Sequence, residues 1–249
     1  FQRTHGQAGG APEGIRIIRC SVARKQDDRT KVVSMDVKVV IFDWDGTLVD
    51  SVDHIADSLH QAATELGYPE LEREAYRDII GLGMIEALEK LYPGITREEM
   101  TTIREGYARY FFAKVTTPQN VFEGMADVLA DLRTAGRGCS VATGKSRRGL
   151  EGALVSSGLG PHFDITRCAD ETRSKPDPAM LGEIIRFYGI EPAEAVMIGD
   201  TRYDLEMAQR IGMPSIGVEW GVHKRDVLGH YAPHAIVDSV KDLRDVLGL

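Results

Sequence analysis

The chain has 249 residues, of which 43% are hydrophobic and 27% are charged, and its formal net charge is −8. This composition is that of an ordinary globular protein, long enough for one large domain or for a core with a smaller second unit. The acidic balance argues against nucleic acid or an anionic membrane as the main partner. Three cysteines without metal-ligand spacing and the absence of an apolar run of about 18 residues disfavour a disulfide framework, a zinc site and a transmembrane helix, and favour a cytoplasmic location.

The first 34 residues differ from the rest of the chain. They begin without methionine, are rich in glycine and arginine, and show no periodic apolar pattern. They lack the apolar region of a secretory signal, and their acidic residues disfavour a transit peptide. We expect residues 1–34 to be a disordered or non-native N-terminal tail, because Met35 stands directly before the first apolar run.

From Met35 onward, apolar runs and helical patterns alternate. Strands are predicted over residues 37–43, 138–144, 163–168, 195–200, 214–220 and 234–238. Helices are predicted over residues 124–135, 147–157, 178–188, 204–211 and 240–247. This alternation is typical of βαβ units, and it predicts an α/β fold with a Rossmann-like parallel sheet flanked by helices.

One long segment interrupts the alternation. Helical patterns occupy residues 51–66, 71–80, 84–91 and 97–114, and no strand pattern lies among them. We therefore predict an all-helical domain at residues 51–118, inserted into an α/β core that comprises residues 35–50 and 119–249. Aromatic residues recur at helical spacing near the end of this segment, and we expect them to pack within it: Tyr107, Tyr110, Phe111 and Phe112.

Polar residues follow three of the predicted strands, and a loop bounded by prolines adds a lysine. They are Asp43 and Asp45 after the first strand, Thr143 to Ser146 after the second, Asp200 with Asp204 after the fourth, and Lys175 in the loop. Ligands bind at the carboxyl ends of the strands in open parallel sheets. We therefore expect these residues to converge at one edge.

Clustered carboxylates of this kind suit phosphoryl transfer. Asp43 and Asp45 point to the same side of an extended segment, where their repulsion at about 6–7 Å is roughly 2–3 kcal/mol for an effective dielectric near 20. A bound Mg²⁺ would offset this repulsion. One aspartate can attack phosphorus, and the other can protonate the leaving alkoxide and later activate water. Lys175 and the Thr143 hydroxyl can then hold the phosphoryl oxygens.

Two alternatives concern single motifs. The sequence GKS at residues 144–146 resembles the phosphate loop of nucleotide-binding proteins, but Cys139 occupies the position where that loop requires glycine. Asp204 can also be explained as a cap of the following helix. The histidines show no metal-ligand spacing, and we expect them to lie at the surface or to cap helices.

Taken together, the motifs DWDGTLVDS, ATGKS, Lys175 in SKPDP, and GDTRYD resemble in order and spacing the four motifs of the haloacid dehalogenase superfamily. The resemblance covers about residues 37–249. The helical domain is similar to the C1-type cap of that superfamily, and the sequence IGVEWG is similar to its phosphoglycolate-phosphatase-like branch.

The resemblance implies roles for individual carboxylates and for the lysine. Asp43 would be the nucleophile and a metal ligand, and Asp45 the general acid and base, with its backbone carbonyl on the metal. Asp200 would be a further Mg²⁺ ligand. Lys175 would steady the nucleophile and the phosphate, and Asp204 would support the metal site from behind its ligands or through Lys175.

The resemblance also implies how substrate is held. Thr143 would bind phosphate through its hydroxyl and Gly144 through its backbone amide. The loop Gly81, Leu82 and Gly83 is our candidate for the part of the cap that faces the catalytic edge, because paired glycines allow a close backbone approach. A plain turn between helices is the alternative for this loop.

The sequence therefore predicts a Mg²⁺-dependent phosphatase that hydrolyses a small phosphomonoester, either phosphoglycolate-like or a sugar phosphate. The alternative is a phosphomutase that uses the same aspartyl-phosphate. Dehalogenation is disfavoured because Asp45, which a phosphate leaving group requires, is present, and a non-catalytic binding module is disfavoured because every catalytic position is filled. The expected partner is a small phosphorylated metabolite, with no nucleic acid and no membrane, and the protein is expected to be a monomer or a homodimer.

Overall fold

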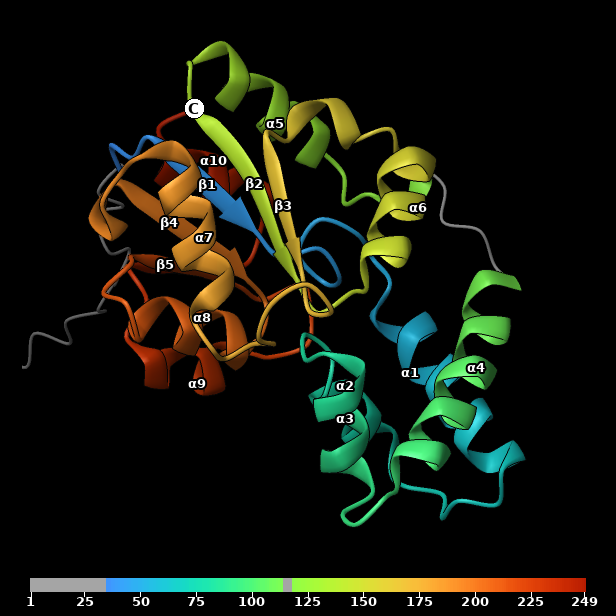
Figure 1. Cartoon of the computed structure of the whole chain (residues 1–249). Coiled ribbons are helices and arrows are strands. Elements are labelled where there is room, and N and C mark those ends of the chain that lie inside the picture. The colour runs from blue at the N-terminus through green and yellow to red at the C-terminus, as the bar shows by residue number, and fades with distance from the viewer. Residues whose placement is uncertain (1–34, 114–117) are drawn as a thin grey trace, which may run out of the picture. The chain divides into compact units, whose positions relative to one another are not determined.

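A six-stranded parallel sheet lies at the centre of the fold (Figure 1). The structure is a computed structural model, which describes residues 35–113 and 118–249. The strands are β1 (Val39–Phe42), β2 (Gly138–Thr143), β3 (Ile165–Cys168), β4 (Ala195–Gly199), β5 (Ser215–Val218) and β6 (Ala235–Val237). They lie in the order β3-β2-β1-β4-β5-β6. All six predicted strands are present, which confirms the α/β class, and the predicted tail at residues 1–34 lies outside the described residues.

Helices cover both faces of the sheet (Figure 1). They are α5 (Met125–Thr134), α6 (Arg147–Ser157), α7 (Ala179–Tyr188), α8 (Arg202–Gln209), α9 (Arg225–Leu228) and α10 (Val240–Leu247). Single turns of 3₁₀-helix occur at Pro118–Asn120, Gly160–His162, Pro192–Glu194 and Gly229–Tyr231. These turns and α9 were not predicted, because elements of three or four residues are too short to show a period.

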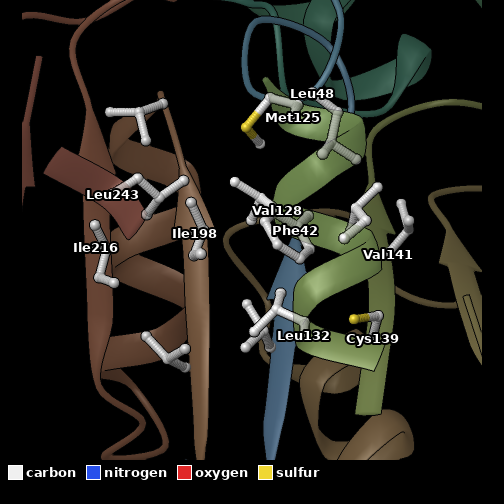
Figure 2. Packing of buried hydrophobic residues seen from close by; sticks show 14 of the residues in the cluster. Phe42, Leu48, Met125, Val128, Leu132, Cys139, Val141, Ile198, Ile216 and Leu243 are labelled. Carbon is white, nitrogen blue, oxygen red and sulfur yellow. The ribbon is translucent and has the colours of Figure 1, made fainter. Parts of the chain in front are cut away.

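The two faces of β1 contribute to two separate apolar clusters. Val40 and Phe42 pack with α5, α6 and α10, whereas Val39 and Ile41 pack with α7 and α8. Figure 2 shows the first cluster, in which Phe42 of β1 lies beside side chains of α5. Burial of each large apolar side chain contributes about 1.5–3 kcal/mol, so both faces hold the central strand in place.

In the sequence, a helical segment follows β1 and precedes β2. It consists of α1 (Val52–Glu65), α2 (Arg73–Asp78), α3 (Met84–Leu91) and α4 (Arg97–Ala113). No strand occurs in the described residues 51–113, and α1 packs against both α2 and α4. These helices share an apolar cluster of their own, which includes Leu59, Leu88 and Ile103. The predicted domain boundary at residue 118 remains a prediction, because residues 114–117 are not described.

The register of the central strands positions the site. Phe42 at the end of β1 pairs with Val141 of β2 and with Ile198 of β4. The chain therefore leaves all three strands at the same edge of the sheet, within two or three residues of these pairs. In the part of the chain that the structure describes, none of the helices has the length and hydropathy needed to cross a bilayer.

Candidate active site

Lys175 is a buried cation between two carboxylates. Its Nζ lies 2.7 Å from Oδ1 of Asp43 and 2.6 Å from Oδ1 of Asp204, and its side chain is fully buried. Burial alone would lower the pKa of Lys175, but the charges of Asp204 and Asp43 outweigh that effect and raise it. Lys175 therefore stays charged and draws together segments that are far apart in the sequence.

Asp43, Asp200 and Asp204 form an acidic cluster beside Lys175. One carboxylate oxygen from each lies within 4.8 Å of the others, and all three residues are buried. Burial raises the pKa of Asp43 well above its usual value; Lys175 opposes the rise, whereas the charges of Asp204 and Asp200 increase it. Three carboxylates and one ammonium leave excess negative charge at this point.

The three carboxylates differ in how far their oxygens are already occupied. Asp204 accepts hydrogen bonds from Lys175, and from the amide and the hydroxyl of Thr201 at 3.1 and 2.6 Å, so it caps α8 while it holds the lysine. Both oxygens of Asp43 are buried; Oδ1 lies 2.7 Å from Nζ of Lys175, and Oδ2 has no hydrogen-bond partner among the described residues. Asp43 thus has free lone pairs at the centre of an anionic cluster. Oxygen donors of this kind fit a hard divalent cation.

Asp200 is fixed by groups that the sequence analysis did not identify. Its Oδ1 accepts a hydrogen bond from the Thr47 hydroxyl at 2.8 Å, and its Oδ2 accepts one from the Val222 amide at 2.8 Å. A Cβ on Gly221 would lie 2.2 Å from Oδ2, so only glycine fits there. Burial and the charge of Asp204 raise the pKa of Asp200 to about 7.

Asp45 lies in different surroundings from the acidic cluster. Its Oδ1 accepts a hydrogen bond from the Ser51 hydroxyl at 2.6 Å and lies 3.0 Å from Nζ of Lys145. Asp43 and Asp45 therefore each have a lysine as counter-charge. The sequence analysis placed Lys145 at this edge of the sheet but did not pair it with Asp45, and it assigned no contact with Asp45 to Ser51.

The predicted phosphate-binding residues and the predicted cap loop lie together. Thr143 is buried, and its hydroxyl accepts a hydrogen bond from the Lys145 amide at 3.2 Å. A Cβ on Gly144 would lie 2.4 Å from the Leu82 carbonyl oxygen and 2.6 Å from that of Gly81. The Gly83 amide donates to the Ser174 hydroxyl at 2.7 Å. The loop between α2 and α3 thus lies against the chain that follows β2.

A second polar cluster joins the helical segment to α8. The carboxylate of Asp78 accepts hydrogen bonds from Lys90 at 2.6 Å and Arg202 at 2.7 Å, and lies 3.0 Å from Nε2 of His223. Burial opposes the shift, but the hydrogen bonds from Lys90 and His223 lower the pKa of Asp78. We call Asp78, Lys90, Arg202 and His223 the Asp78 cluster.

His223 links the Asp78 carboxylate to the start of α8 through its two ring nitrogens. Its Nδ1 accepts a hydrogen bond from the Arg202 amide at 3.2 Å, so Nε2 carries the proton that is donated to Asp78. The residue is buried, whereas the sequence analysis expected a position at the surface or at a helix cap. Of the two expected positions, the helix cap is the one observed, because Nδ1 accepts a hydrogen bond from the first residue of α8.

Comparison with known proteins identifies the family. A family model described as "Haloacid dehalogenase-like hydrolase" matches residues 40–218. The chain is 34% identical over 209 residues to "Probable phosphatase IndB" of Dickeya dadantii, which covers 82% of this chain and 91% of that protein. It is 28% identical over 218 residues to "Phosphoglycolate phosphatase" of Photorhabdus laumondii, with 86% and 93% covered.

Solved structures show the same fold. A predicted phosphatase from Clostridium acetobutylicum superposes with a TM-score of 0.75 at 26% identity, and the match covers 86% of this chain and all of that one. The region matched by the family model contains every carboxylate of the acidic cluster together with Lys175. The chain therefore belongs to the haloacid dehalogenase-like hydrolase family, in its phosphoglycolate-phosphatase-like branch.

Proposed function

We propose that this protein is a Mg²⁺-dependent phosphatase that hydrolyses a small phosphomonoester through an aspartyl-phosphate on Asp43. One observation carries the proposal. The Asp43 carboxylate is buried beside Lys175, Asp200 and Asp204, and while its Oδ1 is paired with Lys175 at 2.7 Å, its Oδ2 has no hydrogen-bond partner among the described residues. A buried carboxylate in this state suits a group that must bind a cation and attack an electrophile.

The Mg²⁺ site would be formed by the carboxylates of Asp43 and Asp200 and by the backbone carbonyl of Asp45. Bound there, the ion would supply positive charge to the phosphoryl oxygens and to the nucleophile. Asp204 would support the site without entering it, because Lys175 and Thr201 already donate to both of its oxygens.

The reaction would use the side chains in two steps. In the first, an oxygen of Asp43 attacks phosphorus while Asp45 donates a proton to the leaving alkoxide. Lys175, the Thr143 hydroxyl and the Gly144 amide hold the phosphoryl oxygens as charge develops on them. In the second step, Asp45 takes a proton from the water that attacks the aspartyl-phosphate, which releases inorganic phosphate and restores Asp43.

The helical segment at residues 51–118 would act as a cap over this site. The contact of Gly81 and Leu82 with Gly144 supports this proposal, because it places a loop of the segment beside a residue proposed to bind phosphate. A cap in this position would exclude water and select substrate, and its opening could limit turnover.

The substrate would be a phosphoglycolate-like ester or a sugar phosphate. The first is favoured by a relative named as a phosphoglycolate phosphatase, which is 28% identical to this chain. A phosphomutase would use the same aspartyl-phosphate but would transfer the phosphoryl group to a second hydroxyl. The protein would act in the cytoplasm on a small metabolite, as a monomer or a homodimer.

The test is a phosphate-release assay over phosphorylated metabolites with Mg²⁺ for the parent protein and for Asp43→Asn. We expect the parent to release inorganic phosphate and the variant to lose about 10⁴-fold or more in kcat. EDTA should abolish release and added Mg²⁺ should restore it. Unchanged turnover by Asp43→Asn would rule out the proposed nucleophile, and isomerised sugar phosphate without phosphate release would identify a mutase.

A further inference from the structure

Lys145 is a nearly buried cation at the edge of the proposed site, and the mechanism above gives it no role. Its side chain is 9% exposed, and Nζ lies 3.0 Å from Oδ1 of Asp45. A buried ammonium group needs anionic partners to replace its lost hydration. Lys175 has two carboxylate partners, whereas Asp45 is the single carboxylate paired with Lys145 within the described residues.

An aromatic pair of α4 lies beside the same ammonium group. Nζ of Lys145 lies 4.8 Å from the centre of the Phe111 ring, and the Tyr107 ring stacks on Phe111 with 5.3 Å between centres. Burial raises the pKa of Tyr107 well above its usual value, and the negative charge of Asp45 raises it further. Tyr107 and Phe111 therefore pack within the helical segment, as expected, and also form a wall beside Asp45 and Lys145, whereas Phe112 is 52% exposed.

The proposed role of Asp45 shows which part of a substrate would lie here. A general acid must come within about 2.6–3.2 Å of the atom that receives its proton, which is the ester oxygen of the leaving alcohol. Lys145 contacts the same carboxylate, so it lies on the leaving-alcohol side of the phosphorus atom. An ammonium group has three N–H donors, and the single carboxylate oxygen paired with it does not use all of them.

We propose that Lys145 is a specificity-determining residue that binds an anionic group carried by the leaving alcohol, either a carboxylate or a second phosphate. This inference rests on the proposed phosphatase function. The ammonium group suits an anion next to the ester oxygen, and the rings of Phe111 and Tyr107 limit the room for a bulky alcohol. The alternative is that Lys145 only orients Asp45, in which case it would affect all esters equally.

The experiment compares three esters that differ in one substituent. Phosphoglycolate carries a carboxylate, ethane-1,2-diol bisphosphate carries a second phosphate, and 2-hydroxyethyl phosphate carries a neutral hydroxyl in the same place. Values of kcat/KM with Mg²⁺ are measured for the parent, Lys145→Met and Lys145→Arg. Lys241→Met is the matched control, because Lys241 lies on α10 and is 80% exposed.

We expect the parent to prefer one of the anionic esters to 2-hydroxyethyl phosphate by at least tenfold, and the preferred ester identifies the anion. Lys145→Met should lose that preference, while Lys145→Arg should keep part of it and Lys241→Met all of it. Equal preference for the three esters in the parent, an unchanged preference in Lys145→Met, or an equal loss for all three esters would overturn the inference.

Binding measurements on a protein without turnover distinguish a failure of this inference from a failure of the proposed function. Asp43→Asn protein should bind the esters without turning them over, so dissociation constants can be measured by calorimetry. Adding Lys145→Met should weaken binding of the preferred anionic ester at least tenfold and leave 2-hydroxyethyl phosphate unchanged; no such difference would again overturn the role of Lys145. Full turnover by Asp43→Asn would instead overturn the nucleophile, whatever the binding data show.

Discussion

The molecule contains two clusters of ion pairs that use the same residue types and differ in charge balance. Around Lys175, one ammonium group faces the carboxylates of Asp43, Asp200 and Asp204, and all four side chains are buried. In the Asp78 cluster, one carboxylate faces Lys90, Arg202 and His223, and the Asp78 side chain is 36% exposed.

The pKa shifts of Asp43 and Asp78 reflect the difference in charge balance between the two clusters. Burial raises the pKa of a carboxyl group in both clusters, but cationic partners reverse the shift only at Asp78. The Asp78 cluster is therefore complete as it stands and can hold the helical segment against α8. The Lys175 cluster has negative charge in excess and becomes balanced only when more positive charge is present. That excess is what makes it a candidate site, because a ligand can supply the missing charge.

In this comparison, the largest expected effect is the loss of folding stability on replacing Lys175. Lys175→Met leaves the buried carboxylates of Asp43 and Asp204 without their ammonium partner, and breaking a buried ion pair costs about 3–5 kcal/mol. We expect the free energy of unfolding at pH 7.5, measured by urea titration, to fall by about this amount. Lys241→Met removes the exposed pair with Asp245 and should change nothing measurable. Equal effects of the two variants would contradict the contrast between buried and exposed pairs.

The next effect concerns Asp200 and pH. Its pKa is about 7 in the folded protein and about 3.9 when unfolded, so the folded state binds the extra proton between these values. The contribution of Asp200 to stability is therefore present at low pH and is lost as pH rises toward 7. In EDTA, we expect the free energy of unfolding of the parent to fall, relative to Asp200→Asn, between pH 5 and pH 7.

The effect of His223 on the pH dependence of stability has the opposite sign to that of Asp200. Burial lowers its pKa, so its unfavourable effect on folding disappears as pH rises. This contribution is common to the parent and to Asp200→Asn, and it cancels in their difference. Mg²⁺ at about 100 times its dissociation constant should add about 2.7 kcal/mol to the parent at pH 7 and less at pH 5, where protons compete for its ligands. If the free energies of unfolding of the parent and Asp200→Asn depended on pH in the same way in EDTA, the assignment of excess negative charge to the Lys175 cluster would be contradicted.

The smallest effect is expected at Asp78. Asp78→Asn keeps the size of the side chain but removes the charge that Lys90, Arg202 and His223 share. Because Asp78, Lys90 and Arg202 are partly exposed, the free energy of unfolding should fall by less than about 1 kcal/mol. If the cluster holds the cap against the core, KM should rise more than kcat falls. A loss of stability as large as that of Lys175→Met would show that the two clusters do not differ as described.

The sequence predicted the Lys175 cluster better than the Asp78 cluster, and the reason is topological. Asp43 and Asp200 follow adjacent parallel strands, so their convergence follows from the rule that the carboxyl ends of such strands meet at one edge. Asp78 and His223 lie in a short helix and in a loop. Their contact depends on how the helical segment packs on α8, which no periodic pattern in the chain encodes.

Within the site itself, the sequence predicted the charged groups and missed the groups that fix them. The hydroxyl of Ser51 and the backbone amide of Val222 each bind a site carboxylate directly. A hydroxyl at the start of a helix, or an amide in a loop, carries no signal of its partner in a single sequence. Lys145 was expected at the same edge of the sheet and was weighed as part of a phosphate loop, but its contact with Asp45 emerged only from the structure.

The central claim is that the phosphoryl group passes through the carboxylate of Asp43. The most direct test uses Asp45→Asn with 4-nitrophenyl phosphate, whose leaving group departs without a general acid, so that transfer to the enzyme proceeds while hydrolysis of the aspartyl-phosphate slows. After rapid acid quench, mass spectrometry of peptides should find one phosphoryl group per protein, on Asp43. Nitrophenolate released in a single burst without phosphate on Asp43, or phosphate on another residue, would contradict the account.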